Sequence, residues 1–158
     1  MAIHLVRYNR KYLTAIVALF NNTIQQVNRE DYSQAELNEW IQSNPNYDLW
    51  HENLESSYCI LVIKAGNLVG FGNITIEGYI DLFYVSHVMI HQGVGRLLFN
   101  ELEKYAVLES VASIYTDASI TATPFFRKMG LDLMRKQDNQ RNNENLINYR
   151  MEKKLVTR

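Results

Sequence analysis

Residues 79–98 read YIDLFYVSHVMIHQGVGRLL and place a strand, a loop and the start of a helix in direct succession. Tyr79–Val85 is rich in aromatic and aliphatic residues, as strands are. From Gly93 to Val111 apolar residues recur at helical spacing, which predicts an amphipathic helix. The loop between them ends in Gln92-Gly93-Val94-Gly95-Arg96, so two glycines stand where the helix begins.

The glycine pair suits a phosphate-bearing ligand. The first N–H groups of a helix have no partner within it, and glycine lets an anion approach them closely. No acidic residue lies between Asp81 and Glu101, whereas His87, His91 and Arg96 do. The alternative is a plain tight turn into a helix, which the glycines would serve equally well. The spacing matches neither a P-loop nor a dinucleotide-binding fingerprint.

Along the rest of the chain, the order of the expected strands and helices predicts an α+β fold around a mixed sheet. Ser33-Gln34-Ala35-Glu36 has the spacing of a capping box, so a helix should begin there. Three consecutive strands before the loop read as an antiparallel meander. The expected strands are 3–8, 58–64, 68–76, 79–85, 113–118, 131–137 and 144–153, with a turn at 138–143, and the expected helices are 12–27, one from 33, 48–54, 93–111 and 123–129.

Composition narrows the function classes. A length of 158 residues fits a single domain, 1–158. The net charge of -1 argues against nucleic-acid binding and against an electrostatic membrane anchor. Cys59 is the only cysteine, so no internal disulfide and no cysteine-based zinc cluster can form. With no signal peptide or membrane span evident, a cytoplasmic protein is expected.

The unit at 79–98 resembles the acetyl-CoA core of the GNAT superfamily, whose motif there is [QR]-x-x-G-x-[GA]. A second block, Thr116 to Leu131, resembles the family's strand–helix segment ending in F-[YF]-x-x-x-G-[FL], and its D-A-S-I-T-A-x-P-F-F form is similar to the bacterial YafP-like branch. The resemblance spans nearly the whole chain. It implies a GNAT fold with a sheet of about seven strands and helices on both faces.

The resemblance also implies an activity. An N-acetyltransferase would move acetyl from acetyl-CoA to an amine of an unidentified small molecule or peptide, by direct attack and without a metal. A homodimer is one assembly that it leaves open. A non-catalytic acetyl-CoA sensor or scaffold of the same fold is the alternative.

The resemblance assigns the cofactor contacts residue by residue. Main-chain N–H groups around the glycine pair would bind the pyrophosphate, and the preceding strand would pair with the pantetheine arm, with the N–H near Val85 polarising the thioester. Ser119 matches the position of a CoA-contacting asparagine. The residues expected to bind cofactor are Leu82, Phe83, Val85, His91, Gln92, Gly93, Val94, Gly95, Arg96, Leu97, Ser119 and Phe126.

Two positions depart from the family pattern. Ile90 occupies the position of the motif's Gln or Arg, which implies rearranged diphosphate contacts. Phe126 occupies the position of the tyrosine that protonates the departing thiolate, and it has no proton to donate. Solvent, Tyr84 or Tyr115 would then supply that proton, although a tyrosine in such a fold is more often a packed aromatic.

An amine acceptor must lose a proton before it attacks, and a carboxylate is suited to take it. Asp81, in the middle of a strand, is the candidate base; the alternative is a rim carboxylate in a salt bridge. Asp117 is the second candidate base, and the alternative is that it stabilises a turn or caps a helix. Cys59 reads as packed core. Acceptor specificity is expected from residues 27–39, with Trp40 and Trp50 either lining a pocket or buried in the core.

Overall fold

The structure is a computed structural model that describes residues 2–155. Its seven strands form one sheet in the order β1-β2-β3-β4-β5-β7-β6. Neighbouring strands are antiparallel except β4 and β5, which run parallel, so the sheet is mixed as predicted. The strands are β1 (Ile3–Arg7), β2 (Tyr58–Lys64), β3 (Asn67–Ile74), β4 (Tyr79–Val85), β5 (Ser113–Ser119), β6 (Asp132–Arg141) and β7 (Glu144–Lys154).

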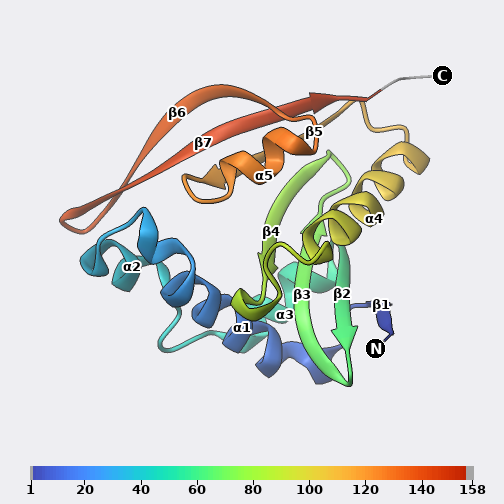
Figure 1. Ribbon diagram of the computed structural model, residues 1–158, viewed down its shortest axis with the longest axis horizontal. Coiled ribbons are helices and arrows are strands. Elements are labelled where there is room, and N and C mark those ends of the chain that lie inside the picture. Colours follow the sequence, from blue (N-terminus) through green and yellow to red (C-terminus); the bar gives the residue numbers. More distant parts are fainter. Residues whose placement is uncertain (1, 156–158) are drawn as a thin grey trace.

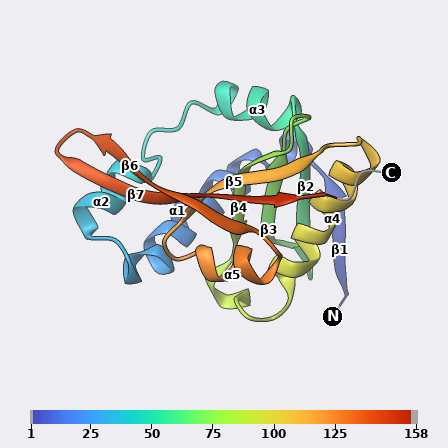
Figure 2. The same ribbon diagram turned by 90° about the horizontal axis from the view of Figure 1, so that it is seen from above.

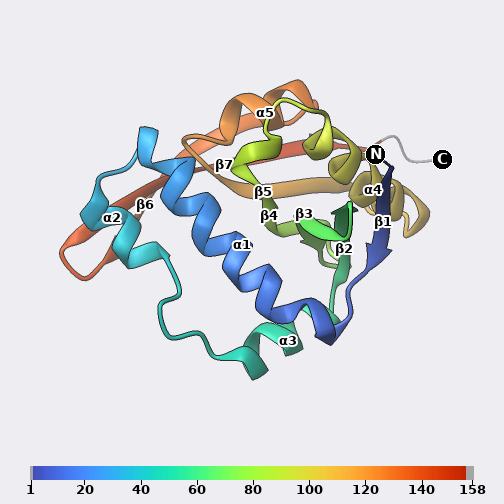
Figure 3. The ribbon, with the colours of Figure 1, turned by 60° about the horizontal axis from the view of Figure 1, so that its bottom comes forward.

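Helices cover both faces of the sheet (Figures 2 and 3). One core lies under α1 (Leu13–Gln26), α2 (Gln34–Trp40) and α3 (Tyr47–Glu55). A second core lies on the opposite face, under α4 (Val94–Leu108) and α5 (Thr123–Lys128). Short 3₁₀ turns add η1 (Arg10–Tyr12), η2 (Asn28–Glu30) and η3 (His87–Met89). Within residues 2–155, no helix combines the length and the apolar character needed to span a membrane.

Local sequence explains where the helices begin and end. Ser33 caps α2 by accepting from the Glu36 N–H, and the Glu36 carboxylate accepts from the Ser33 N–H, so the predicted capping box is present. Pro124 stands in the first turn of α5, where its missing N–H costs nothing. Gly130 follows α5 at φ +98°, a left-handed conformation that ends the helix.

Asp81 is a bulge in β4. In the β3–β4 register Asn73 pairs with Leu82 and Ile74 pairs with Ile80, which leaves Asp81 with no partner on β3. An extra residue reverses the alternation of side chains along a strand. Accordingly Ile80 packs into the core under α4 and α5, whereas Leu82 packs into the core under α1 to α3. The bulge therefore decides which face each β4 side chain occupies.

β4 and β5 pair only where they start. Tyr79 pairs with Tyr115 and Ile80 with Thr116, and no further residue of either strand pairs with the other. The sheet is thus split along its middle from the bulge onward. Beyond that point no strand among residues 2–155 pairs with the β5 edge of β4 or with the β4 edge of β5.

The C-terminal hairpin differs from the prediction. The polar residues 138–143 were expected to form a turn, but β6 continues to Arg141 and only Asn142 and Asn143 connect it to β7. Polar residues are tolerated here because β6 is an edge strand whose side chains are mostly exposed. Figure 1 shows the resulting long hairpin reaching out to α2. There Tyr32 donates a hydrogen bond to the Ile147 carbonyl.

Candidate active site

A cavity of about 910 Å³ occupies the split between β4 and β5. Its lining comes from both faces of the sheet: α1, η2 and α2 on one side, and the loop before α4 together with α5 on the other. The volume lies in the range of small-molecule and cofactor sites. The cavity therefore connects the two layers of the fold.

The edge of β4 presents backbone groups to this cavity. The Ser86 N–H donates to Val69 on β3, and hydrogen bonding alternates along an antiparallel pair. Phe83 and Val85 consequently direct their N–H groups away from β3, and both residues line the cavity. Leu82, predicted as a third backbone contact, instead donates its N–H to Asn73 Oδ1 at 2.8 Å.

The loop before α4 has the backbone shape of an anion site. His91 and Gly93 adopt left-handed conformations, at φ +65° and +84°. Gly93 is the N-cap of α4, and no side chain of the described residues caps that end. A Cβ on Gly93 would meet no atom within 4 Å. The helix N-terminus thus opens into the cavity, with its unpaired N–H groups and partial positive charge.

Gly95 has a different reason to be glycine. A Cβ there would lie 3.0 Å from the Phe125 ring, so the missing side chain lets α4 approach α5 closely. Phe125 in turn packs against Phe83 and Phe126, with ring centroids 5.3 Å apart in each case. Phe126 is buried, and like Phe83 it lines the cavity. These rings form an apolar wall on the α5 side.

Asp81 projects from the bulge into the cavity. The residue is exposed to the cavity space, yet the surrounding protein removes enough water to raise the pKa of its carboxyl. The side chain of Asn73 opposes that shift, and the negative charge of Asp117 adds to it. No ion-pair partner of Asp81 lies among residues 2–155. A carboxylate with a raised pKa and no counter-ion is a better proton acceptor than an ordinary one.

Tyr84 lines the cavity on the face of the sheet that packs against α1. Its ring packs against Phe20 and Phe71, with centroids at 4.7 and 5.7 Å. Burial raises the pKa of the phenol, and a hydrogen bond from the Trp40 side chain partly offsets that effect. At neutral pH the hydroxyl therefore keeps its proton.

Asp117 is held by a set of donors. Arg150 Nε lies 2.7 Å from Oδ1, and the Tyr79 hydroxyl and the Gln137 amide each donate to the carboxylate at 2.8 Å. Burial alone would raise the pKa of this carboxyl, but these hydrogen bonds hold it below its ordinary value. A carboxylate so well stabilised is a poor base, which favours Asp81 over Asp117.

The part of the cavity facing α1 and α2 includes residues from the region 27–39 that was predicted to set acceptor specificity. Asn28 donates to Ser119 Oγ at 3.3 Å, which ties η2 to the end of β5. Trp40 lines the cavity, whereas Trp50 packs edge-on against Phe20 and does not. The first residues of the predicted region 27–39 therefore line the cavity, and so does Trp40, which directly follows that region.

The predicted site residues divide into two sets. Those that line the cavity together are Asp81, Phe83, Tyr84, Val85, His91, Gly93, Gly95, Arg96, Asp117, Ser119 and Phe126. Those outside its lining are Leu82, Gln92, Val94 and Leu97. Val94 is buried in the core, and the Gln92 amide donates to the Val88 carbonyl. Ile90, at the departure from the motif, also lines the cavity.

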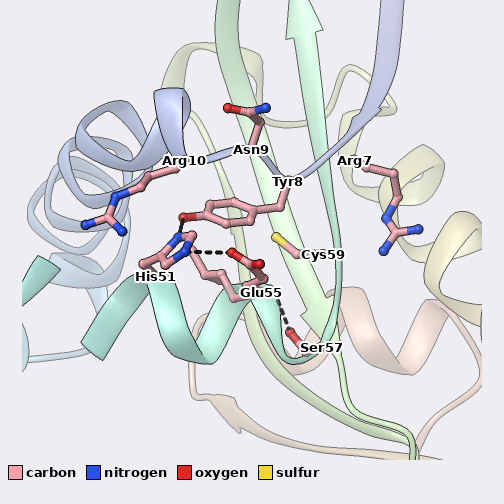
Figure 4. A pocket seen from close by; sticks show the side chains of 9 residues that line it. Arg7, Tyr8, Asn9, Arg10, His51, Glu55, Ser57 and Cys59 are labelled. Atoms are coloured by element: carbon pink, nitrogen blue, oxygen red, sulfur yellow. Dashed lines mark hydrogen bonds and ion pairs between the residues drawn. The ribbon is translucent and has the colours of Figure 1, made fainter. Parts of the chain in front are cut away.

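A second, smaller cavity of about 380 Å³ lies where β1 ends, beside α3 (Figure 4). The Tyr8 hydroxyl is 2.7 Å from His51 Nδ1, and His51 Nε2 is 2.6 Å from Glu55. Arg10 pairs with Asp48 and points away from the others. The polar groups of this cavity thus bond to one another, and we interpret the Tyr8–His51–Glu55 hydrogen bonds as a structural link between the end of β1 and α3.

Comparison with known proteins agrees with this geometry. The family model described as Acetyltransferase (GNAT) domain matches residues 28–155. The chain is 30% identical over 122 residues to the uncharacterized N-acetyltransferase YafP of Escherichia coli, covering 77% of this chain and 76% of that protein.

Solved structures share the whole fold. A GCN5-related N-acetyltransferase from Rhodopseudomonas palustris, also described as an aminotransferase of class II, superposes with a TM-score of 0.92 at 26% identity, covering 98% of this chain and 97% of that one. The PaiA N-acetyltransferase of Thermoplasma acidophilum, solved with coenzyme A, has a TM-score of 0.77 at 17% identity, covering 98% and 100%. This chain, with its split mixed sheet, therefore belongs to the GNAT family of acetyltransferases.

Proposed function

We propose that the protein transfers an acetyl group from acetyl-CoA to the amine of a small acceptor by direct attack within a ternary complex. The observation that carries the proposal is the split between β4 and β5, with the N-terminus of α4 at one end and the carboxylate of Asp81 in its wall, neither of which has a side-chain cap or an ion-pair partner within residues 2–155. These two features suit a diphosphate and an amine, respectively.

The cofactor would enter from the α4 side. Its diphosphate fits the N–H groups that follow Gly93, and Arg96, Lys128 and the two histidines of the loop supply nearby basic groups. The backbone of Phe83 and Val85 is suited to hydrogen-bond the pantetheine arm, because it has no strand partner on that side. Ile90 contributes no polar group, so backbone contacts would carry the diphosphate, in keeping with the open space at Gly93.

Asp81 would act as the general base. It takes a proton from the acceptor ammonium, directly or through a water molecule, and leaves a nitrogen lone pair free to attack the thioester carbonyl carbon. A carbon–nitrogen bond forms, the nitrogen gives its second proton to solvent, and the carbon–sulfur bond breaks, which leaves a neutral amide and a thiolate. The N–H of Val85 is suited to stabilise negative charge on the carbonyl oxygen.

The departing thiolate must gain a proton. Phe126 has none to give, so the donor is solvent or the hydroxyl of Tyr84, which lines the cavity, whereas Tyr115 does not. A thiolate whose parent thiol has a pKa of roughly 8–9 leaves readily, so the reaction does not depend on a strong acid.

The test combines binding and turnover. Acetyl-CoA should raise the melting temperature, because a ligand that binds only the native state stabilises it. Amine-dependent release of free thiol should follow in a colorimetric assay over a panel of amines, with acetylated product identified by mass spectrometry. Stabilisation without thiol release from any amine would favour a non-catalytic binding module.

A matched pair of glycine variants tests the placement of the cofactor. Gly93→Glu should abolish stabilisation by acetyl-CoA, because it sets a negative side chain against the diphosphate. Gly66→Glu is the control: Gly66 also has a left-handed backbone, at φ +78°, and a Cβ there also meets no atom within 4 Å. Equal stabilisation of both variants would refute the proposed diphosphate site.

A further inference from the structure

Charge is unevenly distributed along the cavity. The basic side chains that line it are His87, His91, Arg96 and Lys128, all of them from the segment around η3 and α4 or from α5. The acidic side chains that line it are Glu30, Asp81 and Asp117, from η2 and the two split strands. One end of the cavity is thus basic, and the end that faces α1 and α2 is acidic.

Only part of this acidic charge is neutralised. Asp117 is paired with Arg150 at 2.7 Å. For Glu30 and Asp81 no ion-pair partner exists among residues 2–155. The acceptor end therefore contains two carboxylates that have no counter-ion within residues 2–155: Asp81 at the reacting position and the exposed Glu30 on η2.

The rest of this end is suited to an organic cation. Trp40 and Tyr84 supply aromatic surface, which attracts ammonium groups as well as alkyl chains. Thr23, Gln26 and Asn28 line the same end and supply neutral polar groups. No lysine, arginine or histidine from α1, η2 or α2 is among the described residues that line it.

We propose that the acceptor is a small diamine-like cation, whose attacking nitrogen lies at Asp81 while a second, still protonated ammonium is held by Glu30. The inference rests on the proposed acetyl transfer and adds the class of acceptor. Once Asp81 has accepted a proton, Glu30 is the one carboxylate of the cavity lining still without an ion pair in the described part of the chain, and a second ammonium gives it a counter-ion.

The same arrangement discriminates against acceptors that carry a carboxylate. An amino acid would bring its negative charge among side chains that hold no free cation at this end, and like charges brought together in an interface are strongly unfavourable. A monoamine would avoid this repulsion but would leave Glu30 unpaired. The expected order of kcat/KM is therefore diamine, then monoamine, then amino acid.

The experiment uses three acceptor series of matched chain length: α,ω-diamines, n-alkyl monoamines and ω-amino acids. Each is assayed at saturating acetyl-CoA by thiol release. Glu30→Gln should lower kcat/KM for diamines about fivefold, mainly through KM, and leave monoamines unchanged, as expected for one partly solvated ion pair. Glu52→Gln, an exposed α3 carboxylate outside the cavity, is the matched control and should change neither series.

The outcomes separate the inference from the function on which it rests. Preference for ω-amino acids, or an equal effect of Glu30→Gln on diamines and monoamines, overturns the diamine assignment while acetyl transfer stands. If no amine releases thiol and acetyl-CoA does not raise the melting temperature, the proposed function fails and the acceptor class fails with it. A diamine preference that Glu30→Gln removes supports the inference.

Discussion

Asp117 and Arg150 face each other across β5 and β7, where they are register partners and Arg150 Nε lies 2.7 Å from Asp117 Oδ1. Both side chains are largely shielded, at 22% and 26% exposure. The Tyr79 hydroxyl on β4 also donates to the Asp117 carboxylate. Asp117 on β5 is therefore bonded both to Arg150 on β7 and to β4 on the other half of the sheet. The ion pair therefore lies where the two halves of the sheet still touch.

Breaking this pair should destabilise the fold. Arg150→Met leaves a shielded carboxylate with only neutral donors and should lower the free energy of unfolding by about 1–3 kcal/mol. Urea denaturation at pH 7 measures the loss. Lys136→Met, on exposed β6 and paired in register with Tyr149, is the control and should cost much less. An equal loss in both variants would contradict the role assigned to the pair.

The same carboxylate should make stability depend on pH. Hydrogen bonds lower the folded-state pKa of Asp117 against the effect of burial, so its stabilisation is complete above the unfolded pKa of about 4. That stabilisation is lost as pH falls through the lowered folded-state pKa. Asp117→Asn should therefore be less stable than the parent at pH 7, and the difference should shrink below about pH 4. If the unfolding free energies of the parent and Asp117→Asn differed by the same amount from pH 7 to pH 2.5, the role assigned to the Asp117 carboxylate would be wrong.

Gly95→Ala should loosen the contact between α4 and α5. The new Cβ would lie 3.0 Å from the Phe125 ring, and overpacking of this kind costs about 1–3 kcal/mol. Gly93→Ala meets no atom and should cost only the strain of its left-handed backbone, about 1 kcal/mol. Adding Phe125→Leu should recover part of the loss in Gly95→Ala but none in Gly93→Ala. Denaturation of these four variants and of Phe125→Leu alone tests this, and absence of coupling would be the adverse result.

Asp81→Asn should lower kcat by at least about 100-fold and leave the acetyl-CoA affinity within about twofold of the parent, since removing a general base affects the chemical step. Burial raises the pKa of Asp81, so activity of the parent should fall, as pH decreases, at a pH above that of an ordinary aspartate. Glu77→Gln, in the β3–β4 turn, is the control. Turnover of the Asn variant equal to that of the parent would remove Asp81 from the mechanism.

Cys59 should resist alkylation while the protein is folded. The side chain is 1% exposed, and burial raises the pKa of its thiol to about 12, so at pH 8 about one molecule in ten thousand holds a thiolate. Iodoacetamide should modify it only in denaturant, as mass spectrometry can record. Cys59→Ala should retain amine acetylation, whereas complete loss of turnover in that folded variant would point to an acyl-cysteine route.

Much of the fold could be predicted because its signals are local. Tyr58–Lys64 and Tyr79–Val85 are apolar runs bounded by turns, and the structure confirms both. The capping box at Ser33 is likewise satisfied by residues next to one another. The turn at 138–143 was wrong because a polar edge strand has the composition of a loop. Only its pairing with β7 identifies it as a strand.

Part of the candidate site could also be predicted from local sequence. Gly93 and Phe83 stand in a strand–loop–helix pattern that the sequence displays directly. Glu30 lies in the region predicted for the acceptor and Trp40 was a candidate pocket residue, but only the packing of η2 and α2 decides that both reach the cavity. Arg150, which neutralises Asp117, lies 33 residues away along the chain. Such partners become visible only when the strands are paired.

The bulge at Asp81 has a consequence for sequence change in this protein. Asn73 and Ile74 are consecutive on β3 and pair with Leu82 and Ile80, so deleting Asp81 would make Ile80 and Leu82 ordinary strand neighbours on the faces they already occupy. Such a deletion would straighten β4 and turn no other side chain over. The sheet could therefore lose residue 81 and keep both cores, and what it would lose is the carboxylate in the cavity wall.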